Sequence, residues 1–160
     1  MAMKNCSQLR LVVVGDGSLR AEVNRLAAGL PPGRCRLLGA QTDVYSILRE
    51  IDFVVMPSEW EAFGIAALEA QAFRRPVVAF QIDGLPEAVA DGETGILVPH
   101  RDTAALADAV LRLAGDAQLR WRMGEAGRQR VEQLFSADVM ARQLGAIYQQ
   151  LMKRPLGDDE

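Results

Sequence analysis

The segment between residues 53 and 69 constrains the fold of this 160-residue chain more than any other. It begins with an apolar run, Phe53–Met56, which stops at a proline and has the composition of a buried strand. A polar loop follows, and a helix is expected to start at Gly64. Its expected apolar face comprises Ile65, Leu68 and Ala72. A strand, a loop and a helix N-terminus in this order form the usual anion-binding corner of an α/β protein.

The same alternation of short apolar runs and helical periodicity continues along the chain. Four more strands are expected at Leu11–Val14, Cys35–Leu38, Val77–Phe80 and Ile96–Val98. Expected helix caps are Ser18, Asp43, Thr103 and Ser136, and Pro86 suits the first turn of a short helix. After Pro99 the chain is predicted to be helical to its end, with a frayed tail at 153–160. These features predict one domain with a Rossmann-like parallel sheet, helices on both faces and a helical C-terminal end.

Composition narrows the class of protein. The net charge of −3 argues against a general nucleic-acid binder, and no apolar stretch has the length of a membrane span. Cys6 and Cys35 are too few for a disulfide framework and lack metal-ligand spacing. We therefore expect a cytoplasmic protein without a metal site.

Several residues fall just past the ends of the expected strands. Because ligands of such sheets bind at the carboxyl ends of the strands, these residues should line one rim. They are Gly15, Gly39, Glu61 and Gly84. Gly15 also opens a Gly-Asp-Gly sequence that suggests a dinucleotide fingerprint, but Arg20 stands where the third glycine belongs, and no acid ends the second strand. This segment is either a turn near a bound donor or the domain cleft, or simply the connection between a strand and a helix.

Taken together, these segments resemble the C-terminal, donor-binding domain of the retaining GT-B glycosyltransferases known as group 1 or family GT4. The match runs over roughly residues 11–150, with order and spacing kept. The matching residues are Val13–Arg20, Leu38-Gly39, Asp52–Ser58, Glu61–Gly64, Leu68–Ala70, Pro76–Ala79, Gly84–Glu87 and Asp91–Pro99.

The resemblance implies roles for a Glu-x7-Glu pair. Carried over, Glu61 is the catalytic-site residue that contacts hydroxyls of the donor sugar, and Glu69 holds the ribose of the nucleotide. Eight helical residues advance about 12 Å, comparable to a sugar diphosphate, and a carboxylate accepts two vicinal hydroxyls. The amides around Gly64 would face the phosphate and sugar. The implied donor-binding set is Glu61, Ala62, Phe63, Gly64, Ile65 and Glu69, with Gly15, Gly39 and Gln41 from the loops of the first two strands.

The implied chemistry is transfer of a hexosyl group with retention, in polysaccharide, lipopolysaccharide or glycolipid synthesis. The donor would be a UDP- or GDP-linked sugar, and the family generally needs no metal or other cofactor. Donors fixed at the departing diphosphate would supply most of the stabilisation, so Glu61 is not assigned as a general acid. The family's phosphate-clamping Arg and Lys belong to a segment ahead of the strand at Leu11, and Lys4 lies too close to that strand to replace them. We therefore expect a fragment, residues 1–160, that lacks this segment and the N-terminal acceptor domain and is inactive alone.

Other interpretations stay open. The two glutamates could be exposed surface acids, and Trp60 could either pack beneath its loop or stack on a sugar. His100 is expected at the surface. The arginine-rich face between Arg120 and Arg130 predicts a solvated helix or, alternatively, peripheral contact with the inner face of a membrane. A non-catalytic nucleotide-binding module acting with another chain is the alternative function, and a nicotinamide-dependent oxidoreductase would require NAD binding, which we do not expect.

Overall fold

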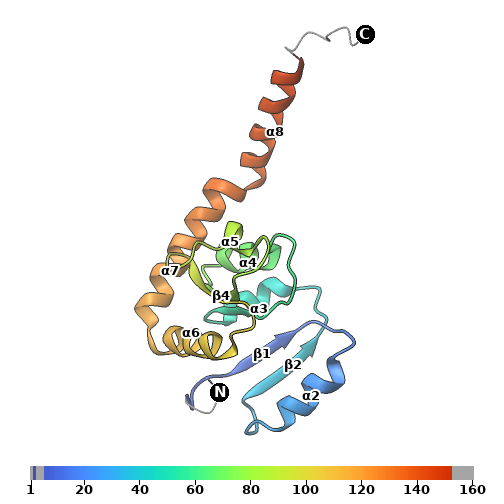
Figure 1. Cartoon of the computed structure of the whole chain (residues 1–160), viewed down its shortest axis with the longest axis vertical. Coiled ribbons are helices and arrows are strands. Elements are labelled where there is room, and N and C mark those ends of the chain that lie inside the picture. The colour runs from blue at the N-terminus through green and yellow to red at the C-terminus, as the bar shows by residue number, and fades with distance from the viewer. Residues whose placement is uncertain (1, 3–5, 153–160) are drawn as a thin grey trace.

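The computed structural model describes residue 2 and residues 6–152 (Figure 1). All five expected strands form, with bounds shifted by at most one residue. The strands are β1 (Leu11–Val14), β2 (Cys35–Gly39), β3 (Val54–Met56), β4 (Val77–Phe80) and β5 (Gly95–Val98). The helices between and after them are α2 (Arg20–Ala28), α3 (Val44–Glu50), α4 (Ile65–Ala72), α5 (Leu85–Ala88), α6 (Thr103–Gly115), α7 (Ala117–Arg130), the π-helical turn η1 (Val131–Phe135) and α8 (Ala137–Met152). The α/β class is confirmed.

The strands form two parallel sheets instead of one continuous sheet. β1 pairs with β2, and β3, β4 and β5 form a second sheet in that order. β4 lies in the middle of the larger sheet, and all four of its residues are buried. This explains why its sequence is a continuous apolar run without alternation.

The core surrounds β4. Figure 1 shows α4 and α5 on one side of this strand and α6 on the other, which gives the flanking helices expected from the sequence. Leu85 of α5, Leu113 of α6 and Met123 of α7 are among the largest fully buried side chains. The larger sheet therefore carries the stable core, and the loops at its strand ends have a rigid base.

The C-terminal part of the chain is helical, as predicted. After Pro99 the helices α6, α7 and α8 follow one another, and α7 continues directly into η1. α8 then projects away from the body of the molecule and holds no buried residue (Figure 1). The tail expected at 153–160 lies outside the described residues, as does Lys4.

Some of the expected helix caps are confirmed, and two are wrong. Asp43 accepts a hydrogen bond from the amide of Ser46 at 3.1 Å, and Pro86 lies in the first turn of α5. The cap of α6 is Asp102, not Thr103, because its carboxylate accepts the amides of Ala104 and Ala105 at 3.1 and 2.9 Å. For α2 the capping position is Leu19, not Ser18, and no side chain caps this helix.

Candidate functional site

The loop between β3 and α4 turns back on itself at Gly64. This residue has φ +90°, in the left-handed region, and its amide donates to Glu61 Oε1 at 3.2 Å. A Cβ at position 64 would lie 2.9 Å from Leu85 Cδ2, so both the backbone and the packing require glycine. The half-buried Glu61 carboxylate is therefore held against the N-terminus of α4.

A second loop, after β4, fixes the backbone of Glu61. Asp83 Oδ2 accepts the Glu61 amide at 3.2 Å, and the Gly84 amide donates to the Glu61 carbonyl at 3.4 Å. A Cβ on Gly84 would lie 2.4 Å from the Ala62 carbonyl oxygen. Glycine at 84 therefore allows the two loops to pack backbone against backbone, which holds Glu61 from both sides.

Glu69 lies in the second turn of α4 and is half-buried. The Tyr45 hydroxyl of α3 donates to Glu69 Oε1 at 3.4 Å. The Tyr45 ring stacks on Phe73, with centroids 5.5 Å apart and planes 15° from parallel. Tyr45 therefore bridges α3 and α4 and positions the Glu69 carboxylate.

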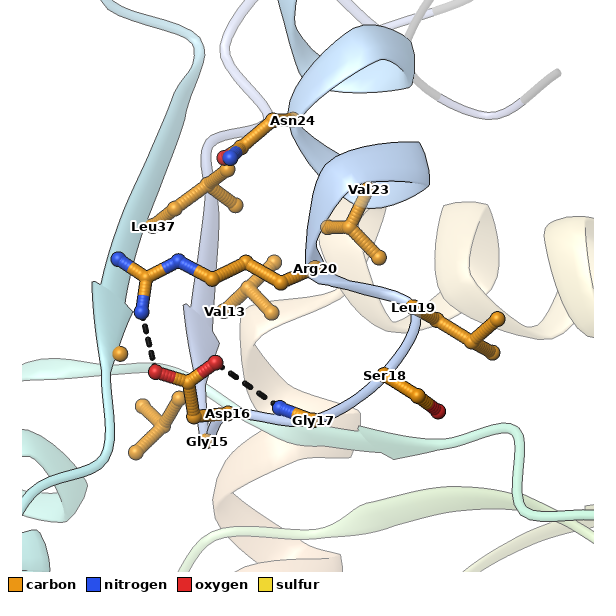
Figure 2. Close-up of a pocket in the computed structure, with 12 residues that line it drawn as sticks. Val13, Gly15, Asp16, Gly17, Ser18, Leu19, Arg20, Val23, Asn24 and Leu37 are labelled. Atoms are coloured by element: carbon orange, nitrogen blue, oxygen red, sulfur yellow. Dashed lines mark hydrogen bonds and ion pairs between the residues drawn. The ribbon is translucent and has the colours of Figure 1, made fainter.

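The residues after β1 and β2 form a separate group. Gly15 and Gly39 have φ of +119° and +69°, and the Gly15 amide donates to the Gly39 carbonyl at 2.8 Å. Asp16 then pairs with Arg20 and accepts the Gly17 amide at 2.9 Å (Figure 2). These contacts make the Gly-Asp-Gly segment a closed turn at the start of α2.

A pocket of about 360 Å³ lies over this turn (Figure 2). Its walls come from β1, β2 and α2, and neither Glu61 nor Glu69 lines it. Gln41, in the loop after β2, is exposed and donates from Nε2 to the Leu38 carbonyl at 2.8 Å. The predicted site residues therefore fall into two clusters, one on each sheet.

The remaining predicted residues around α4 point in different directions. Phe63 meets Phe135 of η1 edge to face, with centroids 5.9 Å apart, and Ala62 is exposed. Ile65 is 66% exposed, so its placement on the buried face of α4 is wrong. The buried residues of this helix are Ala67, Ala70 and Gln71. α7 packs against Gln71 of this helix with Gly127 and against Arg74, in the turn after the helix, with Gly124.

Charged groups gather beside the loop that carries Glu61. Arg101, after β5, donates from Nε and from a terminal nitrogen to Glu59 Oε2 at 2.8 and 2.6 Å. These hydrogen bonds lower the pKa of Glu59 and raise that of Arg101. His100 is exposed, as predicted, and its Nε2 lies 3.4 Å from the same carboxylate oxygen. Trp60 is 75% exposed at the tip of the loop, so it does not pack beneath it.

The arginines of α7 do not form a purely solvated face. Arg120 donates to the Leu113 carbonyl at 2.6 Å, Arg128 to the Ala72 carbonyl at 2.6 Å and Arg130 to the Glu87 carbonyl at 2.8 Å. They cap the ends of other helices and attach α7 to the body. The expectation of a fully solvated arginine face is therefore wrong.

Two residues of the site carry no local sequence signal. Tyr45 is 24 residues from its partner Glu69, and Asp83 is 22 residues from Glu61. An Asp-Gly pair after a strand does mark a turn at position 83, but it does not reveal the residue that the carboxylate holds.

Across the described part of the chain, no cluster of three or more His, Cys, Asp or Glu could hold a metal, and no helix has the length and apolar character of a bilayer span.

Comparisons with known proteins agree on one family. The family model for glycosyl transferases group 1 matches residues 2–116. An alpha-D-kanosaminyltransferase from Streptomyces kanamyceticus is 36% identical over 146 residues, which cover 89% of this chain and 38% of that protein. An N-acetyl-alpha-D-glucosaminyl L-malate synthase from Bacillus anthracis is 32% identical over 145 residues, covering 90% and 38%.

Solved structures show the same fold. Sucrose-phosphate synthase from Thermosynechococcus elongatus superposes with a TM-score of 0.80 at 34% identity, covering 94% of this chain and 40% of that one. Anabaena Alr3699/HepE in complex with UDP gives 0.83 at 25% identity, covering 93% and 43%. The chain thus spans less than half the length of these relatives, which fits the C-terminal domain of a GT-B protein. The chain belongs to the group 1 glycosyl transferases.

Proposed function

We propose that this chain is the donor-binding domain of a retaining glycosyltransferase. It binds a nucleoside-diphosphate sugar and presents the hexosyl group for transfer to an acceptor with retention at the anomeric carbon. The observation that carries the proposal is the fixed position of Glu61 at the N-terminus of α4, held by the Gly64 amide and by Asp83. A carboxylate fixed in this way needs little reorganisation when it accepts hydroxyls of a sugar.

The proposed contacts divide along α4. Glu61 accepts hydroxyls of the donor sugar, and Glu69, positioned by Tyr45, accepts hydroxyls of the ribose. The amides of Phe63 and Ile65 contribute donors toward the diphosphate, since the Gly64 amide is already bonded to Glu61. Gly15, Gly39 and Gln41 lie on the side of the nucleotide base. No metal or other cofactor takes part in this proposal.

The donor is a UDP- or GDP-linked sugar, and the solved complex of Alr3699/HepE with UDP supports the first. The diphosphate gains negative charge as it departs, so full activity also needs cations aimed at it. In the proposal these cations and the acceptor site belong to polypeptide outside residues 1–160. The domain alone therefore turns over little or no donor, and the complete protein serves polysaccharide, lipopolysaccharide or glycolipid synthesis in the cytoplasm, at the inner face of the membrane where the acceptor is a lipid.

Calorimetric titration tests donor binding directly. UDP, GDP and ADP, their hexose conjugates and NAD are titrated into the chain and into the Glu69→Ala variant. One nucleoside diphosphate should bind, and the substitution should weaken it about tenfold to hundredfold, because a charge-assisted hydrogen bond contributes about 1.5–3 kcal/mol. Glu50→Ala is the matched control, since Glu50 is exposed at the far end of α3 and should leave binding unchanged.

Two outcomes would count against the proposal. Binding of NAD in competition with the nucleoside diphosphates would favour an oxidoreductase. The proposed donor site would also be wrong if no nucleotide bound to this chain or to a version extended by the preceding domain of a relative. The extended version also tests the non-catalytic alternative. If the protein is an enzyme, the Glu61→Gln substitution should slow the release of nucleoside diphosphate from its sugar conjugate.

A further inference from the structure

η1 brings a residue of the C-terminal helices to the loop that carries Glu61. This π-helical turn joins α7 to α8 and contacts α4. Its last residue, Phe135, meets Phe63 edge to face, with ring centroids 5.9 Å apart and planes at 69° to each other. Phe63 immediately precedes Gly64, whose amide donates to Glu61 Oε1 at 3.2 Å. A side chain from the C-terminal part of the chain therefore touches the turn that holds the Glu61 carboxylate.

The π-helical winding of η1 explains how Phe135 reaches this position. In an α-helix each residue turns by about 100°, so Phe135 would lie about 140° around the axis from Arg130. A π-helical turn instead bonds a residue to the fifth one after it, which brings Phe135 back to the side of Arg130. The Arg130 guanidinium accordingly lies over the Phe135 ring, 5.6 Å from its centroid, at the distance of a cation–π contact.

Arg130 in turn attaches this ring to a second segment beside the site. Its Nη2 donates to the Glu87 carbonyl of α5 at 2.8 Å. α5 begins after Gly84, which packs directly on the Ala62 backbone of the Glu61 loop. The Arg130 Nε is buried and has no hydrogen-bond acceptor among the described residues. The guanidinium is therefore held between one carbonyl and one ring, and both belong to the surroundings of the Glu61 loop.

The contact between the two rings lies outside the hydrophobic core. Phe63 is 36% exposed and Phe135 is half-buried, and neither belongs to the apolar cluster around β4. The ring pair therefore adds little to the stability of the whole fold. It does restrain the backbone that leads into Gly64, and glycine has more conformational freedom than any other residue. A left-handed turn at a glycine needs such a restraint if it is to persist.

We infer that Phe135 is a positioning residue for Glu61. Its ring fixes Phe63, Phe63 restrains the left-handed turn at Gly64, and that turn presents the Gly64 amide to the Glu61 carboxylate. Arg130 fixes the Phe135 ring from the other side. The consequence for the donor sugar rests on the proposed function, in which Glu61 contacts that sugar. The restraint of the loop itself requires no ligand.

Exchange of the Gly64 amide with solvent, measured by NMR without ligand, tests the restraint. Phe135→Leu keeps an apolar side chain but removes the ring, so this amide should exchange about two- to tenfold faster than in the parent, as expected for the loss of one aromatic pair. Phe135→Tyr keeps the ring and should retain the exchange rate of the parent. Leu134→Ala, in the same turn at a side chain that is 48% exposed, is the matched control and should change nothing.

The Val78 amide of the buried strand β4 serves as the internal reference for folding. It should stay protected in every variant, which separates local loosening of the loop from unfolding. Arg130→Met is a second variant that removes the cation from the Phe135 ring, and it should also speed the exchange at Gly64. Unchanged exchange at Gly64 in both Phe135→Leu and Arg130→Met, with Val78 protected, would overturn the inference.

Calorimetric titration distinguishes this inference from the proposed function. In Phe135→Leu the affinity for the hexose conjugate should fall about two- to tenfold, and that for the free nucleoside diphosphate should fall less, because Glu61 contacts only the sugar in the proposal. Equal weakening of both ligands would overturn the assignment of Phe135 to Glu61. A parent chain that binds no nucleotide counts against the proposed function alone, because the exchange at Gly64 still decides whether Phe135 positions the loop.

Discussion

At the scale of single residues, the site depends on backbone geometry as much as on charge. Glu61 is held by an amide of its own loop, and that amide is available because Gly64 takes up a left-handed conformation. A side chain at position 64 would change both the local conformation and the contact with α5. Gly64 is therefore part of the machinery that orients the carboxylate, although it has no side chain of its own.

Gly64→Ala should lower the free energy of unfolding by about 2–4 kcal/mol. The left-handed conformation costs an alanine about 1 kcal/mol, and the new Cβ at 2.9 Å from Leu85 Cδ2 forces repacking. Chemical denaturation measures the change. Gly17→Ala is the control, because a Cβ there meets nothing within 4 Å, and it should stay within about 0.5 kcal/mol of the parent. An equal loss of stability in the two variants would show that the loop around Gly64 adapts to a side chain without cost.

The Glu59–Arg101 contact predicts a pH effect with a definite sign. Hydrogen bonds from Arg101 lower the folded-state pKa of Glu59 below its ordinary value of 4.5. The stabilisation is therefore present above that value and is lost as pH falls through the lowered pKa. Arg101→Gln should raise the pKa of Glu59 toward 4.5, which carbon-13 NMR titration of the carboxyl group measures. A titration midpoint unchanged by the substitution would mean that the pair does not persist in solution.

At the scale of elements, local pattern identified strands better than it identified helix faces. The continuous apolar run at residues 77–80 predicts a buried strand, because a strand that is covered on both faces needs apolar residues at every position. The pattern does not predict the buried face of α4, because Gln71, a polar residue, is fully buried there and donates to the carbonyls of Ala67 and Ala88 at 3.2 and 3.0 Å. Which face is covered depends on α7, and no pattern within α4 contains that information.

The site shows the same limit. The positions of Glu61, Gly64 and Glu69 along β3, its loop and α4 follow from sequence order, so the strand–loop–helix unit was predictable. The contacts that come from elsewhere in the fold are those of Asp83, after β4, with the Glu61 backbone amide and of Tyr45, on α3, with the Glu69 carboxylate. Pairings between elements depend on tertiary packing, which the periodicity of one segment does not encode.

Alanine substitutions at two helical glycines should change stability in opposite directions, because one glycine packs against the turn after α4 and the other faces open space. A Cβ on Gly124 of α7 would lie 2.3 Å from the Arg74 carbonyl oxygen, whereas one on Gly145 of α8 meets nothing within 4 Å. Gly124→Ala should destabilise the protein by about 2–4 kcal/mol, because backbone cannot move aside cheaply. Gly145→Ala should favour its helix by up to about 1 kcal/mol, since alanine is the better helix former.

Thermal and chemical unfolding of the two alanine variants separates helix propensity from packing. Propensity alone would make both substitutions favourable. A neutral or stabilising Gly124→Ala would show that α7 does not approach the turn after α4 closely in solution.

At the scale of the whole molecule, stability and apolar exposure are unevenly distributed. The core surrounds the larger sheet, whereas α8 projects from the body without a buried residue (Figure 1). One stripe of this helix nevertheless carries large apolar side chains that are about half exposed. They are Leu144, Ile147, Tyr148 and Leu151. A stripe of this kind is costly to leave in water, so copies of the isolated chain should associate through it as their concentration rises.

Removing residues 142–160 should therefore abolish association and leave folding almost intact. None of the removed residues that the structure describes, 142–152, is buried, so the Tm should change by no more than about 2 °C. Light scattering over a concentration series measures association. In the full chain, Leu144→Glu with Ile147→Glu should act like the truncation, whereas Gln149→Glu, also exposed on α8, should not. A full chain that stays monomeric at high concentration, or a truncated chain that unfolds at much lower temperature, would show that α8 packs on the body instead of standing free.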